Sequence, residues 1–183
     1  MMTERNEKHG TLHRAVDKTS DALGGIIGRA AANTAGSTSA ASFVENAAIG
    51  DMYEIAAAKV ALQHAQSDLV KAAALKMIAD HTTSTHQLRS AMIMNETEGV
   101  PALPDSIDAR RKTMLDHLQA APADKFDATY LDQQILAHKE TVDLMNGFKD
   151  GGDNAQLRSF AAGTAPVVER HLAAMERLRE RIA

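Results

Sequence analysis

The chain has 183 residues, with no cysteine or tryptophan and only six other aromatic residues, and its formal net charge is -4. Without cysteine, neither a disulfide framework nor a thiolate metal site can form, and a core of Ala, Leu, Ile, Val and Met suits close helix packing better than a β-sandwich. The mixed charges argue against a nucleic-acid partner, and no apolar run approaches the roughly 20 residues that a membrane-spanning helix needs. The length fits one domain.

Residues 1–41 are expected to form an N-terminal arm with a small-residue linker, ahead of a helical domain at residues 42–183. A weak helical stripe crosses the arm: Leu12, Val16, Thr19, Leu23 and Ile26. Nearby glycines weaken its far end by about 1 kcal/mol each. The arm is therefore a frayed tail, an amphipathic surface segment, or a docking element for a protein partner or a second copy of the chain.

The first residues do not resemble a signal peptide. Five of the first ten are charged or histidine, and the apolar patch at residues 23–27 contains two glycines. A secretory signal has a longer apolar core after a basic start. We therefore expect a cytoplasmic protein.

The first long helix is predicted to begin at Ser42, because Glu45 three residues later completes a capping-box pattern. Its inward stripe follows helical spacing: Phe43, Ala47, Gly50, Glu54, Ala58, Ala61 and Ala65. The alanines allow the backbone of a partner helix to approach closely. Ser67 or Asp68 marks a tight turn and caps the next helix.

The second helix is predicted from about Leu69 to Glu96. Its buried side carries Val70, Ala74, Met77, His81, Leu88 and Met92. His86 falls on another face and is expected to be exposed. Gly99 and the two prolines that follow it stop the helix.

Residues 97–122 are predicted to cross over rather than to form a tight turn. Asp105 or Ser106 would start a short amphipathic helix there, and Pro122 would end it. Asp124 would then cap the third long helix. The apolar side of that helix carries Phe126, Tyr130, Leu131, Ile135, His138, Val142, Met145 and Phe148.

The last helix has the clearest pattern in the chain, and Asn154 can cap it. Its seam recurs at steps of four and three: Leu157, Ala161, Thr164, Val168, His171, Met175, Leu178 and Ile182. Such a seam packs against other helices. Pro166 lies inside the pattern and should bend the helix, either as a packing adjustment or, with Gly163 nearby, as a hinge. The sequence predicts an all-α bundle of four long helices with a short helix in the crossover.

Several short motifs occur along the chain in an order and spacing typical of one family. They are Phe43, Ala47, Ala48, Gly50, Met52 and Glu54; Met77 with Asp80 and His81; Phe126, Asp127 and Tyr130; His138; Phe160 and Ala161; and Pro166, His171 and Leu172. Over about residues 42–180 the chain resembles an uncharacterised bacterial family that is often labelled predicted outer membrane protein. The resemblance implies a ferritin-like four-helix bundle and supplies no reaction. The chain departs from that family in lacking a recognisable export signal.

Four polar side chains fall on the inward stripes of four different long helices: Glu54, His81, His138 and His171. Imidazole and carboxylate ligands suit Zn, Fe, Ni or Cu, so we hypothesise a site for a divalent transition-metal ion. A di-iron centre is not expected, because the Glu-x-x-His motif of such bundles is replaced by Ile78, Ile135 and Val168 at the acidic position. The alternative is a polar layer in which each histidine donates to a carboxylate or carbonyl.

The heights of these residues along the bundle test the hypothesis. Glu54 and His81 lie about equally far from the turn near Ser67 and should be level. His171 lies about five residues further from the second turn than His138, which predicts a stagger of roughly 7 Å. The sequence thus places Glu54, His81 and His138 in one layer. His171 would join them only through its side-chain length or a bend at Pro166.

For function, the favoured interpretation is a non-enzymatic helical bundle that binds a partner or a metal ion, in a stress response as for other ferritin-like bundles. The alternative is a metalloenzyme with redox or hydrolytic chemistry at Glu54 and the inward histidines. No nucleophile-elbow or phosphate-loop pattern occurs, so hydrolase and nucleotide-binding classes based on those motifs have no support.

Overall fold

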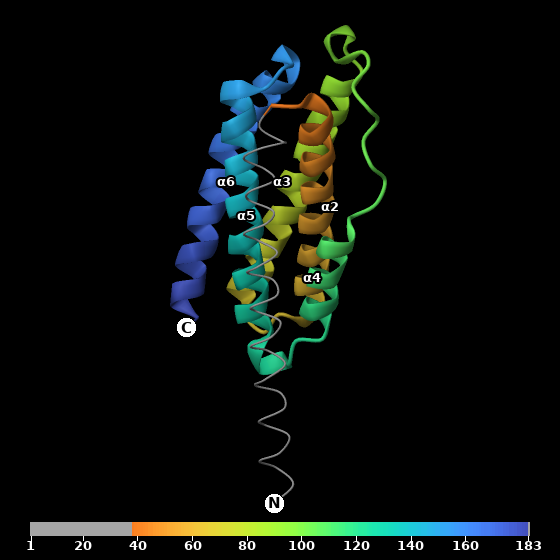
Figure 1. Ribbon diagram of the computed structural model, residues 1–183. Helices are drawn as coiled ribbons and strands as arrows, with labels where there is room; N and C mark the ends of the chain where they lie inside the picture. Colours follow the sequence, from red (N-terminus) through yellow and green to blue (C-terminus); the bar gives the residue numbers. More distant parts are fainter. Residues whose placement is uncertain (1–37, 183) are drawn as a thin grey trace, which may run out of the picture.

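The computed structural model describes residues 38–182, which form an all-α bundle. The long helices are α2 (Ala40–His64), α3 (Asp68–Met92), α5 (Phe126–Gly151) and α6 (Ala155–Arg181), and they run side by side (Figure 1). The short helix α4 (Ala109–Gln119) lies in the crossover, as predicted. Within the described residues there is no strand, so the predicted fold class is confirmed. The predicted stripe of the N-terminal arm lies outside these residues.

Short turns join α2 to α3 and α5 to α6, and the crossover between α3 and α5 carries α4 along the flank of α2 (Figure 1). The ion pairs of α4 with α5 were not foreseen from the sequence. Arg110 and Arg111 both bind the buried carboxylate of Glu140, and the Arg111 guanidinium lies 4.9 Å from the centre of the Tyr53 ring. The crossover helix is thus fixed by charge as well as by Met114 and Leu118, which are buried.

The bundle has two apolar clusters separated by a polar layer. One cluster, near the α5–α6 turn, is centred on Phe43, Phe148 and Leu157. The other, toward the α2–α3 turn, includes Met77 and Met175. The buried polar residues between them include the histidines that the sequence placed on the inward stripes.

The start of α2 differs from the prediction. Ser42 is not its cap, because the helix already begins at Ala40 and the Ser42 carbonyl accepts a bond from the Asn46 side chain within the helix. The capping group comes from the turn between α5 and α6: Asp153 Oδ1 accepts from the Ala40 amide at 2.8 Å. A partner 113 residues away leaves no local sequence signal.

Other helix ends show the same effect. Ser67 holds the expected N-cap position of α3, but its side chain makes no cap bond, and its backbone amide instead donates to Asp127 Oδ2 at 2.8 Å. The predicted Asp124 cap of α5 is wrong as well, because α5 begins after a short 3-10 turn at residues 123–125 and its N-cap position is Lys125.

Of the remaining predicted helix limits, some differ from the structure and one is confirmed. The second helix ends at Met92, before the predicted Glu96, and the crossover helix is capped by Asp108, not by Asp105 or Ser106, and ends before Pro122. The Asn154 cap is confirmed, since its side chain accepts from the Leu157 amide at 3.0 Å.

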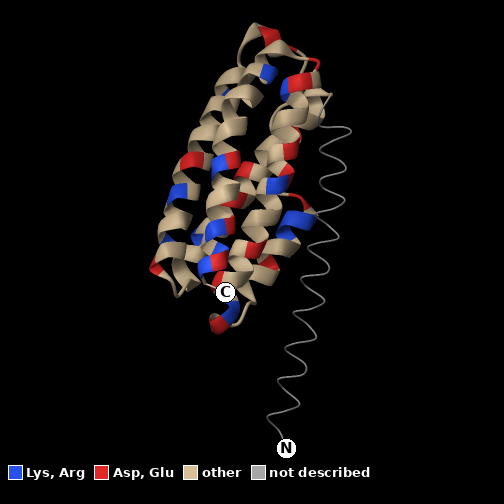
Figure 2. Cartoon of the chain, turned by 90° about the vertical axis from the view of Figure 1, so that its left-hand side faces the viewer, with Lys and Arg blue, Asp and Glu red and all other residues tan. Residues whose placement is uncertain are grey.

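The seam of α6 is confirmed. Its first six members are buried, and Leu178 and Ile182 pack against the apolar cluster that lies toward the α2–α3 turn. The helix continues through Pro166, which is on the exposed side. None of the described helices combines the length and the apolar character needed to cross a membrane. In the view of Figure 2, acidic and basic positions are interspersed along the helices.

Candidate metal centre

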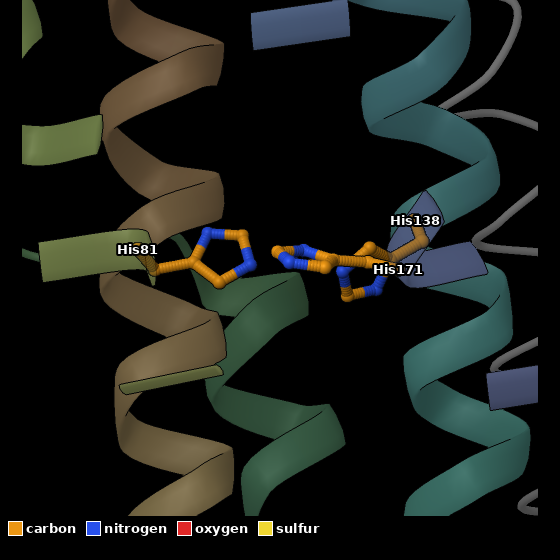
Figure 3. Close-up of side chains that lie close together, drawn as sticks. All are labelled: His81, His138 and His171. Carbon is orange, nitrogen blue, oxygen red and sulfur yellow. The ribbon is translucent and has the colours of Figure 1, made fainter. Parts of the chain in front are cut away.

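Three histidines from three helices meet in the polar layer. His81 comes from α3, His138 from α5 and His171 from α6, and Figure 3 shows the ring of His81 facing the other two. One ring nitrogen from each lies within 4.8 Å of the others, and the ring centroids are 5.4–5.7 Å apart. All three residues are at most 4 % exposed.

The predicted stagger between His138 and His171 is wrong. His138 lies 13 residues before Gly151, the end of α5, and His171 lies 16 residues after Ala155, the start of α6. The stagger therefore amounts to only three residues, about 4.5 Å. Side chains also lean toward the N-terminus of their own helix. In these antiparallel helices that brings the two rings toward the same level.

Each histidine uses one nitrogen for a hydrogen bond that orients its ring. His81 Nδ1 lies 2.8 Å from Asp51 Oδ1, His138 Nδ1 lies 2.9 Å from the Gln134 carbonyl, and His171 Nε2 lies 2.7 Å from Asp80 Oδ2. A carbonyl or carboxylate oxygen can only accept, so the hydrogen-bonded nitrogen in each ring carries the proton. Each neutral ring then holds its lone pair on the other nitrogen.

The other three nitrogens have no hydrogen-bond partner among the described residues. They are His81 Nε2, His138 Nε2 and His171 Nδ1, all of them buried. Three lone pairs that lie close together in a buried layer repel one another, and a buried acceptor without a donor costs about 1–3 kcal/mol. The arrangement therefore suits a cation. Hydrogen bonds on the far nitrogen are how proteins commonly orient metal-binding histidines.

Glu54 lies beside this group and not within it. Its Oε1 is 3.5 Å from His138 Nδ1, and both of its oxygens lack a hydrogen-bond partner among the described residues. Asp51, one helical turn earlier on α2, is also buried and bonds to His81 and to Thr85 Oγ1. Within the described chain neither carboxylate pairs with a lysine or arginine. Among the described residues, no lysine or arginine therefore neutralises the negative charge next to the rings.

The environments of the rings shift their pKa values differently. Burial lowers the pKa of His138, and the charge of Glu54 only partly opposes this. Burial also lowers the pKa of His171, to about 4, against the opposing bond to Asp80. For His81, burial is again the largest influence and lowers the pKa, but the bond to Asp51 and the charges of Glu54, Asp51 and Asp80 together raise it. His138 and His171 are therefore neutral at pH 7, as metal ligands must be.

The sequence missed the residues that orient the rings. Asp51 precedes Glu54 by three positions, which is the spacing of one helix face, and that spacing could have identified it. Asp80 is partly exposed, and its Oδ2 also lies 2.7 Å from Lys76 Nζ, so it looks like an ordinary surface residue. The Gln134 carbonyl is a backbone group and carries no sequence signal. His86 is exposed, as predicted.

The fold and this site define an all-α helical bundle with a buried three-histidine cluster. Residues 28–178 match the model of a family described as Domain of unknown function (DUF4142), and the chain belongs to that family. The predicted resemblance to an uncharacterised family is confirmed to this extent, while the ferritin-like and outer-membrane labels stay predictions. A search of curated protein sequences gave no significant match.

Two solved structures share the fold. One is described as CopM in the Cu(II)-bound form, with 20% sequence identity and a TM-score of 0.65, covering 79% of this chain and 98% of its own. The other is a DUF305 fragment from Deinococcus radiodurans, with 16% identity and a TM-score of 0.65, covering 78% of this chain and 95% of its own. At these identities the likeness extends to the fold alone.

Proposed function

We propose that the protein binds one divalent transition-metal ion through His81, His138 and His171, with Glu54 and Asp51 balancing its charge. The observation that carries the proposal is a set of three buried ring nitrogens that have no hydrogen-bond partner among the described residues, each on a ring that is oriented by a hydrogen bond at its other nitrogen. A structural polar layer would use both nitrogens of a ring or would leave the second one near solvent.

The geometry needs only a small adjustment to hold an ion. Imidazole nitrogens bind zinc at about 2.0–2.1 Å, which places nitrogens of a tetrahedral site about 3.3 Å apart. One ring nitrogen of each histidine lies within 4.8 Å of the others, so the rings would close by up to about 1.5 Å around an ion of this bond length. Modest ring rotations accomplish such a movement.

Cu(II) is the ion we expect to bind most tightly. Sites made of nitrogen and oxygen ligands follow the order in which Cu(II) exceeds Zn(II), Ni(II), Co(II) and the earlier metals. The cluster has no thiolate ligand, since the chain has no cysteine. The Cu(II)-bound state of the structural neighbour CopM gives independent support for copper in a bundle of this shape.

Burial favours binding over catalysis as the role of the site. The three histidines and Glu54 are each at most 4 % exposed. A substrate would have to open the bundle to reach the ion. One groove between α3 and α6, with a volume of about 390 Å³, is lined by Gln87, Ala91, Phe160, Thr164 and their neighbours and by none of the cluster residues. We therefore infer a non-enzymatic metal-binding protein.

The test is the metal content and affinity of protein purified without a histidine tag. Titration with Cu(II) and Zn(II) should give one tightly bound ion per chain. His81→Ala, His138→Ala and His171→Ala should each weaken binding at least tenfold. His86→Ala is the matched control, because His86 lies on α3 near His81 but is exposed and outside the cluster. Equal affinity in the wild type and in all three cluster variants would contradict the proposal.

A further inference from the structure

A second group of buried polar atoms adjoins the three histidines. It consists of both carboxylate oxygens of Glu54, both side-chain amide atoms of Gln134 and the hydroxyl of Tyr130. No described residue forms a hydrogen bond with any of these atoms, and the three side chains are at most 2 % exposed. Buried polar atoms of native proteins are normally paired with protein or with ordered water.

These side chains face the same interior space as the cluster. Tyr130, Gln134 and His138 follow one another at steps of four on α5, so they lie on one face, a turn apart. Glu54 approaches from α2, with Oε1 3.5 Å from His138 Nδ1. The charge of Glu54, after burial, also raises the pKa of Tyr130. Glu54 therefore lies beside His138, and Gln134 lies one helical turn from His138 in the direction of the α2–α3 turn.

The cluster itself leaves a coordination position open. Three imidazoles supply three ligands, whereas zinc sites have at least four and copper sites are commonly tetragonal. The Glu54 carboxylate does not belong to the group whose ligand atoms lie within 4.8 Å of one another. A small molecule that fits between the ion and the carboxylate would satisfy both.

We propose that one exchangeable water molecule completes the coordination of the ion and is held by Glu54 and the Gln134 amide. The donors and acceptors match: the water oxygen faces the cation, one hydrogen goes to the Glu54 carboxylate and the other to Gln134 Oε1. The Gln134 amide hydrogens can then pair with the remaining Glu54 oxygen. Such buried waters typically make about three hydrogen bonds. The inference rests on the proposed metal binding and adds to it the identity of the fourth ligand.

The test is electron paramagnetic resonance of the Cu(II)-loaded full chain, prepared in ordinary and in ¹⁷O-enriched water. The wild type should show broadening of the copper signal by ¹⁷O. Glu54→Leu should bind Cu(II) more weakly and lose the broadening. Glu54→Gln keeps an oxygen acceptor of the same length and should retain it. Glu45→Leu, on the exposed side of the same helix, should behave as the wild type.

The outcomes separate the two proposals. A protein that binds no Cu(II) refutes the metal-binding function, and the fourth ligand with it. Stoichiometric binding without ¹⁷O broadening in the wild type leaves the metal site standing and overturns the coordinated water. Broadening that persists in Glu54→Leu overturns the role of Glu54. If Glu54→Leu does not fold, Gln134→Leu gives the same comparison, because loss of the amide should reduce the ¹⁷O coupling.

Discussion

Binding of Cu(II) is expected to raise the melting temperature of the protein by about 5–11 °C. An ion that binds only the folded state adds about 2.7 kcal/mol at a free concentration of 100 times its Kd. In a domain of 150–250 residues each kcal/mol moves the melting temperature by about 2–4 °C. The physical source of the gain is the charge of Asp51 and Glu54, which are buried and have no lysine or arginine partner in the described chain, and the three lone pairs that face one another.

Thermal unfolding followed by circular dichroism measures this shift, with free Cu(II) set by a metal buffer. His138→Ala should melt lower than the wild type without copper, because the hydrogen bond from the ring to the Gln134 carbonyl is lost. Its melting temperature should respond to copper by less than about 2 °C, since linkage falls with affinity. His86→Ala should keep the full response.

An equal shift in His138→Ala and in the wild type would mean that the ion binds elsewhere, for instance at His9 or His13 of the arm. Absence of a shift with Cu(II), Zn(II), Mn(II) and Fe(II) alike would refute the reasoning. The cluster would then be a structural polar layer, in which His81→Ala destabilises by about 1–3 kcal/mol for its unsatisfied partners.

Three further predictions concern pH, the orienting bonds and the packing. Apparent Cu(II) affinity should fall as the pH drops, beginning above 6.5, because protons compete for the rings and the raised pKa of His81 makes it the first to protonate. Competition titrations at pH 7.5, 6.5 and 5.5 measure this, and a flat profile would contradict it. Asp51→Asn should weaken Cu(II) binding about 10–100-fold, as measured by calorimetry, because the charge that supports His81 is removed. Gly152→Ala should destabilise by about 1–3 kcal/mol in urea unfolding and leave copper stoichiometry unchanged, because a Cβ there would lie 2.5 Å from the ring of Phe148, which is stacked on Phe43.

The seams of the long helices could be predicted from the sequence because burial follows the helical period directly. Leu157, Ala161 and Val168 are buried where the period places them. The start of α2 could not be predicted, because the carboxylate that accepts from its first amide, Asp153, comes from the turn between α5 and α6. A local capping pattern such as Ser42 with Glu45 carries no information about a capping group that only the folded chain brings to the helix start.

The candidate site, like the fold, could be predicted only in part. The inward stripes identified His81, His138 and His171, because each stripe position is a matter of periodicity alone. Their convergence was not predictable, because it depends on the direction in which side chains leave antiparallel helices and on the true lengths of the turns. Two of the three ring partners could not be found, since a backbone carbonyl and a partly exposed aspartate have no distinctive pattern.

The cost of the cluster is the strongest argument that it serves an ion. A bundle without a ligand in this layer would be expected to fill the layer with apolar residues, since replacing buried charges by packed apolar side chains is often neutral or stabilising. Here two buried carboxylates, Asp51 and Glu54, and three ring nitrogens are set between two apolar clusters. The charge of the carboxylates and the lone pairs of the rings are both stabilised by positive charge at the same point. A divalent cation at that point meets both demands at once, and no side chain of the described bundle does.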